Sequence, residues 1–78
     1  MKELIEYISR SLVEDPTQVN VSQVKNGGSV NIYLEVAKED MGRVIGRRGR
    51  VANAMRNLLR VPAAKERKRI NLEIVEPE

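Results

Sequence analysis

The stretch GRVIGRRGRVANAMR, from Gly42 to Arg56, contains three glycines and five arginines in fifteen residues. Glycine destabilises a helix because it has the most backbone freedom to lose, and closely spaced arginines repel one another. The apolar residues of the stretch nevertheless recur with helical spacing. We therefore predict two helices joined by a loop at Gly46–Gly49 that is built to hold a negatively charged ligand.

The basic residues of the chain are concentrated in its second half. Met1–Asp40 carries four basic and seven acidic residues, whereas Met41–Glu78 carries ten and four. All ten lie between residues 43 and 69, where Glu66 is the one acidic residue. Such one-sided clustering suits a phosphate-rich ligand, although a solvated basic face gives the same count.

The composition restricts the classes of protein that the chain can belong to. With 78 residues, 41% of them hydrophobic, it suits one small domain, which we place at residues 1–76 with a tail at 77–78. It contains no cysteine and no histidine, which excludes disulfides, Cys/His metal sites and imidazole acid–base chemistry. We expect neither an enzyme nor a metal, cofactor or small-molecule substrate. Acidic residues interrupt the N-terminal apolar segment, so we expect a cytoplasmic protein without a signal peptide or membrane anchor.

Apolar periodicity predicts the first half of the fold. Residues 1–13 have helical spacing, with Tyr7 expected at the edge of the core, and an Asp-Pro pair at 15–16 ends the helix. Apolar residues then alternate over 19–24 and 30–36, on either side of the turn sequence NGG. This pattern predicts an antiparallel hairpin with one apolar face.

The second half is expected to contain two helices and a strand. A short helix over 41–45 is capped by Asp40 and ended by Gly46, and a longer helix runs from residue 49 or 50 to residue 60 or 61. Pro62 lacks an N–H group and disfavours continuation of this helix. The helix is therefore expected to end there, with room for one more turn, and a basic loop is expected to follow. Residues 70–74 alternate again and predict a last strand.

The predicted order is helix, strand, strand, helix, helix, strand. The last strand should lie parallel to the second hairpin strand, joined to it by a right-handed crossover. Because each strand has only one apolar face, all three helices should cover the same side of a three-stranded mixed sheet. The predicted fold class is therefore α+β.

Two glycines flank the predicted loop, whose sequence is Gly46-Arg47-Arg48-Gly49. They permit backbone angles closed to other residues and remove the Cβ atoms that would keep a ligand away, and the following helix offers unpaired N–H groups. Arg47 and Arg48 can project into solvent beside a bound anion. The spacing matches neither a nucleotide P-loop nor a dinucleotide fingerprint. A purely structural turn between helices remains an alternative.

The segment RVIGRRGRVANAMRNLL, set after a helix and a hairpin and before a final strand, resembles the K-homology (KH) motif. The order of elements is similar to the type II arrangement, and the resemblance covers nearly the whole chain. At this length, with EDMGRVIGRRGRVANAMR at its centre, the chain is most similar to the small stand-alone bacterial KH proteins of the KhpA family. Ala52 stands where many KH motifs have a larger aliphatic residue, so Val51 is expected to take the apolar role.

The resemblance implies a groove that binds about four nucleotides of single-stranded RNA. The loop Gly46–Gly49, with Arg50 next to it, would clamp the RNA backbone, and Val44 and Ile45 would contact the bases. The opposite wall would be formed by the segment after the last helix, where strand-edge backbone groups can bond base edges. The residues implied for this wall are Lys65, Arg67, Lys68, Arg69 and Ile70.

The longer helix supports a second hypothesis. Its apolar residues spread over an arc of about 160°, wider than the ~100° that a core-facing stripe typically needs. The members of the arc are Val51, Ala52, Ala54, Met55, Leu58 and Leu59. We therefore take Met55, Leu58 and Leu59 as a candidate dimer interface. The resemblance implies pairing through this helix, with a second copy or with a larger Jag-like KH protein (KhpB).

Two functions remain open from the sequence. The first is a non-enzymatic, broadly specific clamp for single-stranded RNA that acts as a post-transcriptional regulator or RNA chaperone. The alternative is a protein-interaction module in which RNA binding is weak or vestigial, and DNA binding through the loop is a less favoured third. Tyr7 and Tyr33 are the only aromatic residues, so no stacking platform is expected. Tyr33 is expected to be an exposed residue on the open face of the sheet.

Overall fold

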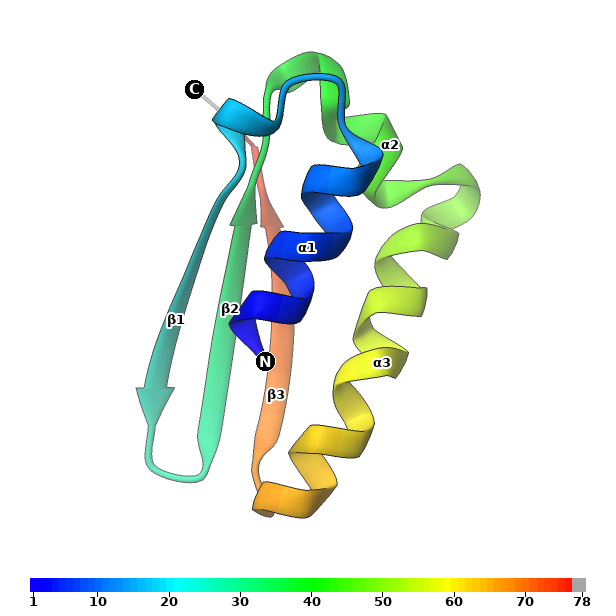
Figure 1. The fold of residues 1–78 in the computed structure, drawn as a ribbon. Coiled ribbons are helices and arrows are strands. Elements are labelled where there is room, and N and C mark those ends of the chain that lie inside the picture. Colours follow the sequence, from blue (N-terminus) through cyan, green and yellow to red (C-terminus); the bar gives the residue numbers. More distant parts are fainter. Residues whose placement is uncertain (77–78) are drawn as a thin grey trace.

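The computed structural model describes residues 1–76 of the chain (Figure 1). Within these residues lie three α-helices, α1 (Lys2–Leu12), α2 (Met41–Ile45) and α3 (Arg50–Glu66), and three strands, β1 (Asn20–Asn26), β2 (Ser29–Glu35) and β3 (Arg69–Val75). Short 3₁₀ turns connect them at Pro16–Gln18, Lys38–Asp40 and Arg47–Gly49. The predicted order of elements is confirmed. The predicted tail at 77–78 lies outside the described residues.

The three strands form one mixed sheet in the order β1-β2-β3. β1 and β2 pair antiparallel, with Ser22 opposite Tyr33. β2 and β3 pair parallel, with Asn31 beside Asn71 and Tyr33 beside Glu73. Both predicted pairings are confirmed. Because β2 is central, β3 has a free edge, and this edge lies on the side of α3 (Figure 1).

The core lies between the sheet and the helices, which all cover the same face of the sheet (Figure 1). Along β2, Val30, Ile32 and Leu34 are buried, while Asn31 and Tyr33 point to the open face and are half-buried. Each helix adds at least one buried residue, and these are Ile5, Val44, Met55 and Leu59. Full burial of one such side chain contributes about 1.5–3 kcal/mol. The shared apolar layer therefore fixes where the loop between α2 and α3 stands relative to β3.

The prediction that the long helix ends at residue 60 or 61 is wrong, because α3 continues through Pro62 to Glu66. The extra turn adds Ala63 to the buried side chains of α3. It also closes with paired hydrogen bonds, from the Lys68 N–H to the Ala63 carbonyl (2.9 Å) and from the Arg67 N–H to the Ala64 carbonyl (3.2 Å). This is a Schellman arrangement. Burial and a satisfied C-terminus together offset the hydrogen bond that proline cannot make.

Asp40 stands at the N-cap position of α2, as predicted, but its side chain makes no capping hydrogen bond to that helix. Its buried carboxylate accepts hydrogen bonds from the backbone N–H groups of Glu14 (3.0 Å) and Asp15 (3.2 Å). The Arg43 guanidinium lies 3.4 Å from the same carboxylate, which offsets part of the cost of burying a charge. Asp40 therefore ties the segment after α1 to the start of α2.

Candidate nucleic-acid interface

The backbone of the loop between α2 and α3 depends on glycine at its first position. Gly46 has φ 76° and ψ 173°, a combination essentially restricted to glycine. A Cβ at this position would lie 2.5 Å from Val51 Cγ2 and 2.8 Å from the Val51 backbone nitrogen. The loop therefore packs directly on the first turn of α3, and Gly46 is required for the fold of the loop itself.

The second glycine of the loop has open space around it. Gly49 is left-handed, with φ 74° and ψ 16°, and a Cβ there would meet only Asn53 Nδ2, at 3.8 Å. No side chain caps the start of α3, so an anion can approach its N–H groups and the positive end of its dipole. Between the glycines, Arg48 also has a positive φ of 56°. Such strain in a residue other than glycine is typical of functional loops.

Three arginines in or next to the loop have no ion-pair partner within the described part of the chain. Arg47, Arg48 and Arg50 are exposed and line one hollow. None of the ion pairs among residues 1–76 includes them. Arg43, in contrast, binds Glu14 at 2.6 Å. The three loop arginines are therefore available to an external anion, whereas Arg43 stabilises the fold.

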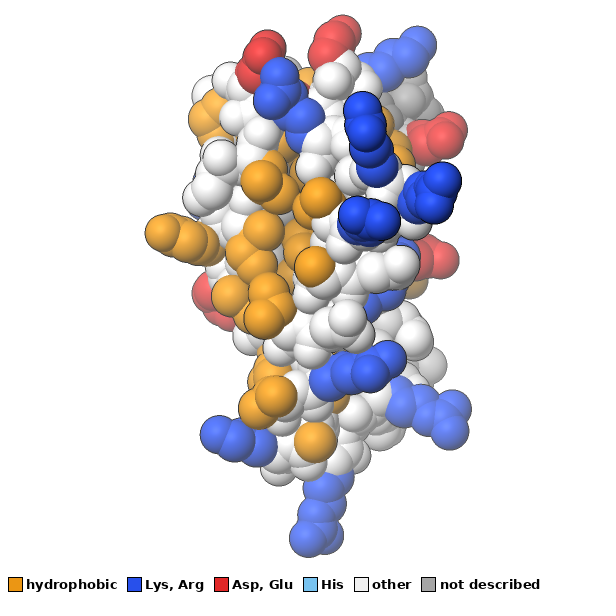
Figure 2. Space-filling view, turned by 90° about the vertical axis from the view of Figure 1, so that its right-hand side faces the viewer, with side chains coloured by type: hydrophobic (Ala, Val, Ile, Leu, Met, Phe, Trp, Pro, Cys, Tyr) orange, Lys and Arg blue, Asp and Glu red, His pale blue; other side chains and the backbone are white. Residues whose placement is uncertain are grey.

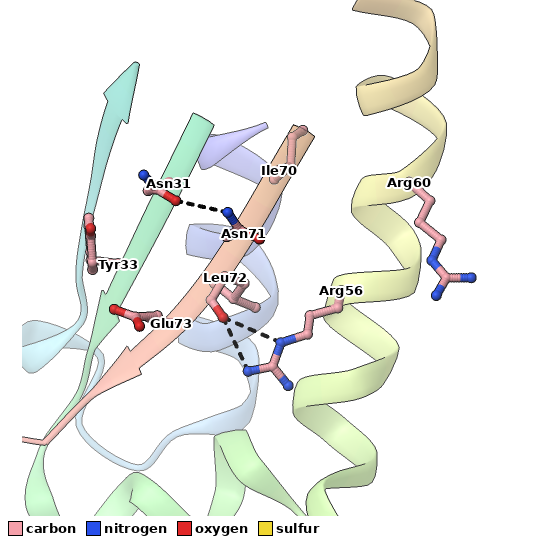
Figure 3. A pocket seen from close by; sticks show the side chains of 8 residues that line it. All are labelled: Asn31, Tyr33, Arg56, Arg60, Ile70, Asn71, Leu72 and Glu73. Atoms are coloured by element: carbon pink, nitrogen blue, oxygen red, sulfur yellow. Dashed lines mark hydrogen bonds between the residues drawn. The ribbon is translucent and has the colours of Figure 1, made fainter. Parts of the chain in front are cut away.

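A second hollow lies between α3 and the free edge of β3 (Figure 3). Arg56 reaches across it, and its Nε and Nη2 donate to the carbonyl oxygen of Leu72 at 3.3 and 3.1 Å. Its Nη1 donates to Asn53 Oδ1 at 3.2 Å. Arg60 lines the same hollow one turn further along α3. The free edge of β3 therefore faces a basic flank of α3.

The residues of the predicted opposite wall lie in the last turn of α3, the connecting turn and the start of β3. These residues are Lys65 in the last turn of α3, Arg67 and Lys68 in the connecting turn, and Arg69 and Ile70 in β3. Lys68 and Ile70 border a hollow together with Arg56 and Arg60. The structure thus brings part of the predicted wall into contact with the basic flank of α3.

The face that carries α3 is divided by chemistry (Figure 2). Lys and Arg side chains gather mainly on one half of the view, and hydrophobic side chains gather on the other. At about 100° per residue, Arg56 and Arg60 lie only about 40° apart, whereas Leu58 lies about 200° round from Arg56. α3 therefore has a basic flank toward β3 and an apolar flank on its other side.

Two residues next to the loop differ in how they can meet a base. Val44, predicted to contact a base, is fully buried in the core cluster and has no exposed surface in this structure. Ile45 is half-buried and remains accessible.

Ala52 is buried, while Val51 packs half-buried against the core. Ala52 therefore keeps the core-facing position of the KH pattern despite its small size.

The candidate dimer interface is reduced by the structure to one of its three residues. Met55 and Leu59 are buried in the core, because their arc of α3 faces the sheet. Leu58 is 52% exposed on the apolar flank.

Tyr7, predicted at the edge of the core, is 74% exposed, since it lies about 200° round α1 from the buried Ile5.

Arg56 and Arg60 are the site residues that sequence reasoning missed. Their spacing of four residues places them on one face of a helix, and this signal is present in the sequence. The sequence does not say which flank of α3 faces β3, because that depends on how the helix packs on the sheet. The hydrogen bonds from Arg56 to Leu72 provide this information.

Residues 1–76 form three helices and three strands, and the same range bears on metal and membrane sites. Nowhere in this range do three or more Asp or Glu side chains come together in a group that could hold a metal ion. No helix in the same range has the length and apolar character needed to cross a membrane.

The order of helices and strands, with a glycine-flanked loop between α2 and α3, defines a type II KH domain. The chain belongs to the KhpA/KhpB KH-domain family, whose model matches residues 2–74. This family is non-enzymatic, in agreement with the sequence-based expectation.

Relatives align with the chain over almost its full length. The "RNA-binding protein KhpA" of Clostridium acetobutylicum is 48% identical over 75 residues, which is 96% of this chain and all of that protein. The proteins of the same name from Halalkalibacterium halodurans (42%, 97% of this chain and all of that protein) and Borreliella burgdorferi (43%, 95% of this chain and 90% of that protein) are also similar. No solved structure gives a significant match.

Proposed function

We propose that the protein binds single-stranded RNA in a groove that runs from the Gly46–Gly49 loop along the basic flank of α3 and the free edge of β3. The observation that carries the proposal is the set of three exposed loop arginines without an acidic partner among the described residues. The relatives named as RNA-binding proteins support the same assignment.

In this proposal the loop holds the phosphates. Gly49 leaves the start of α3 open to a close approach, and Arg47 and Arg48 neutralise the charge of the backbone. The half-buried Ile45 offers an apolar surface to the adjoining base. Charge and apolar surface thus alternate as they do along a nucleotide chain.

The opposite wall is the edge of β3. The unpaired backbone groups of an edge strand can bond the edges of bases without strong sequence preference. One of these groups, the Leu72 carbonyl, is occupied by Arg56 in the free protein. A base must therefore either dock beside Arg56 or replace Arg56 at the Leu72 carbonyl. If Arg56 is replaced, its guanidinium becomes free to bind a phosphate.

The test is titration of labelled single-stranded RNA at several salt concentrations with the Arg47→Asp/Arg48→Asp variant. A matched control, Lys25→Asp/Lys38→Asp, makes the same change in net charge at two exposed lysines, on β1 and in the turn before α2, that also form no ion pair among residues 1–76. We expect the loop variant to lose binding and the control to retain it, with equal folding by circular dichroism. A milder Arg47→Ala change should lower the logarithmic salt slope by about 0.7 for each phosphate that the loop no longer binds. Full binding by the folded loop variant would overturn the proposal.

A groove of this kind reads few base identities, which suits a broad-specificity role. The protein would act as a post-transcriptional regulator or RNA chaperone in the bacterial cytoplasm. Its contribution would be to hold short unpaired segments and release them readily, because a groove of about four nucleotides makes few contacts.

A second candidate function is pairing through the apolar flank of α3. Leu58 is 52% and Val61 62% exposed, and hydrophobic side chains gather on this half of the face (Figure 2). The partner would be a second copy or a larger KH protein of the KhpB type. Leu58→Glu should lower the sedimenting mass or abolish partner binding, while Asn57→Glu, on the adjacent exposed position, should not. A strict monomer at high concentration, with no binding to such a partner, contradicts this function.

A further inference from the structure

The face of the sheet opposite the helices carries a group of polar side chains next to the free edge of β3. Asn31 pairs in register with Asn71, and Tyr33 pairs with Glu73, so all four side chains project from neighbouring positions on this face (Figure 3). We call them the open-face cluster. Asn31 and Tyr33 are half-buried, and Asn71 and Glu73 are exposed. The proposed groove assigns no role to these four side chains, although they line the same second hollow as Arg56 and Arg60.

The hydrogen-bonding groups of the open-face cluster are only partly occupied. Asn71 Nδ2 donates to Asn31 Oδ1 at 3.0 Å. The amide group of Asn31 therefore still has donors to offer, and Asn71 keeps a carbonyl acceptor. Glu73 adds a carboxylate, which only accepts, and Tyr33 adds an aromatic ring. Adjacent donors and acceptors beside a ring match the edge and face of a nucleobase.

The cluster is continuous with the basic flank of α3. One hollow, of about 560 Å³, is lined by the four residues and also by Arg56 and Arg60. Its volume falls within the range of about 300–1,000 Å³ that is typical of small-ligand sites. The hollow therefore passes round the edge of β3 from the helix side of the sheet to the open face.

The charges in this hollow select one kind of ligand. A phosphate on the open face would be repelled by Glu73, and a basic peptide would be repelled by Arg56 and Arg60. A nucleotide avoids both repulsions when its phosphate faces Arg56 and Arg60 and its base lies on the open face beside Glu73. Glu73 then accepts a hydrogen bond from an exocyclic amino group, a pairing that carboxylates make with cytosine.

We propose that the open-face cluster binds one additional nucleobase with an exocyclic amino group, from the same RNA strand that lies in the groove. The base stacks on Tyr33 and bonds Asn71 and Glu73, and Arg60 holds its phosphate. This inference rests on the proposed RNA binding and lengthens the strand that the protein contacts beyond the groove.

The test uses the intrinsic emission of Tyr33. The chain has two tyrosines and no tryptophan, so a Tyr7→Phe variant reports on Tyr33 alone. Three RNAs are compared: a tetranucleotide, an octanucleotide with cytidine flanks round the same core, and an octanucleotide with abasic flanks. We expect only the cytidine-flanked octamer to quench Tyr33 and to bind more tightly than the abasic one, by about fivefold or more.

Two variants complete the test. Tyr33→Ala should remove the affinity gained from the cytidine flanks and leave tetranucleotide binding unchanged, whereas Tyr33→Phe should keep the gain. Uridine flanks, which lack the amino group, should bind more weakly than cytidine flanks. Equal affinity for the abasic and cytidine octamers, with unquenched Tyr33, overturns this inference and leaves the proposed groove standing. Failure of the tetranucleotide to bind overturns the proposed groove, and the inference with it.

Discussion

Gly49→Asp and Gly49→Asn form a matched pair that tests whether a phosphate lies at the start of α3. The two side chains have nearly the same size and shape and differ in charge. Gly49 has φ 74° and ψ 16°, a left-handed conformation that Asp and Asn tolerate better than other residues. A Cβ at Gly49 meets only Asn53 Nδ2, at 3.8 Å. Both variants should therefore fold.

The cost to folding should be small for both variants. A residue with a Cβ loses about 1–2 kcal/mol in this conformation, and the lower backbone entropy of its unfolded state returns about 0.5–1 kcal/mol. The net loss in the free energy of unfolding should be about 1 kcal/mol. Asp should be no less stable than Asn, because a negative charge at a helix start contributes about 0.3–1 kcal/mol.

The effect on RNA binding should separate the variants. A carboxylate about 6 Å from a phosphate costs about 0.7–2.8 kcal/mol for effective dielectric constants between 80 and 20. We expect Asn to weaken binding modestly by crowding the phosphate, and Asp to weaken it by about a further tenfold. The additional loss should shrink as salt is added.

The assay is fluorescence anisotropy of a labelled single-stranded RNA, at low and at physiological salt, for the wild type and both variants. Urea denaturation provides the matching folding data. Equal affinities of the Asp and Asn variants at low salt would refute the placement of a phosphate at Gly49. The loop would then be a structural turn.

Three changes should alter stability in predictable directions, measured by thermal or urea denaturation. Gly46→Ala should lower the free energy of unfolding by about 2–3 kcal/mol or more, because its φ and ψ exclude other residues and a Cβ would meet the Val51 backbone nitrogen at 2.8 Å; an unchanged midpoint would contradict this. Ser9→Ala should raise it by about 1 kcal/mol, since the Ser9 hydroxyl is buried and has no hydrogen-bond partner among the described residues; destabilisation would show that the hydroxyl is satisfied. Arg67→Gly should raise it by about 0.5–1 kcal/mol, because Arg67 closes α3 with φ 55°; a loss would mean that its side chain stabilises the turn.

The sequence predicts the order and pairing of the elements because these depend on local spacing and on handedness rules. Alternation over β2 is confirmed by which residues are buried. The helix predicted over 1–13 is confirmed as α1, and its Ile5 is buried, but Leu4 and Leu12 of its apolar spacing are exposed. The prediction that Gly46 ends the short helix is confirmed as well. The fold class follows from such patterns, since each strand with one apolar face needs a helical layer on one side only.

The remaining errors come from tertiary packing. Val44 is implied as a base contact by the family resemblance, and Met55 belongs to the wide apolar arc of the long helix, but both are buried in the core. Pro62 looks like a helix end, but α3 continues through it. The basic flank formed by Arg56 and Arg60 can be recognised only when the edge of β3 is known to lie opposite. Patterns in the local sequence do not say which strand edge lies opposite a helix.

The measurement that tests the proposed groove most directly is NMR mapping of a labelled protein with a single-stranded tetranucleotide. We expect the largest amide shifts at residues 45–50 and 70–72, with side-chain shifts at the Nε of Arg56. The apolar flank round Leu58 and the exposed side of α1 round Tyr7 should stay unchanged. Shifts confined to these two regions, with none at 45–50, would contradict a groove between the loop and β3.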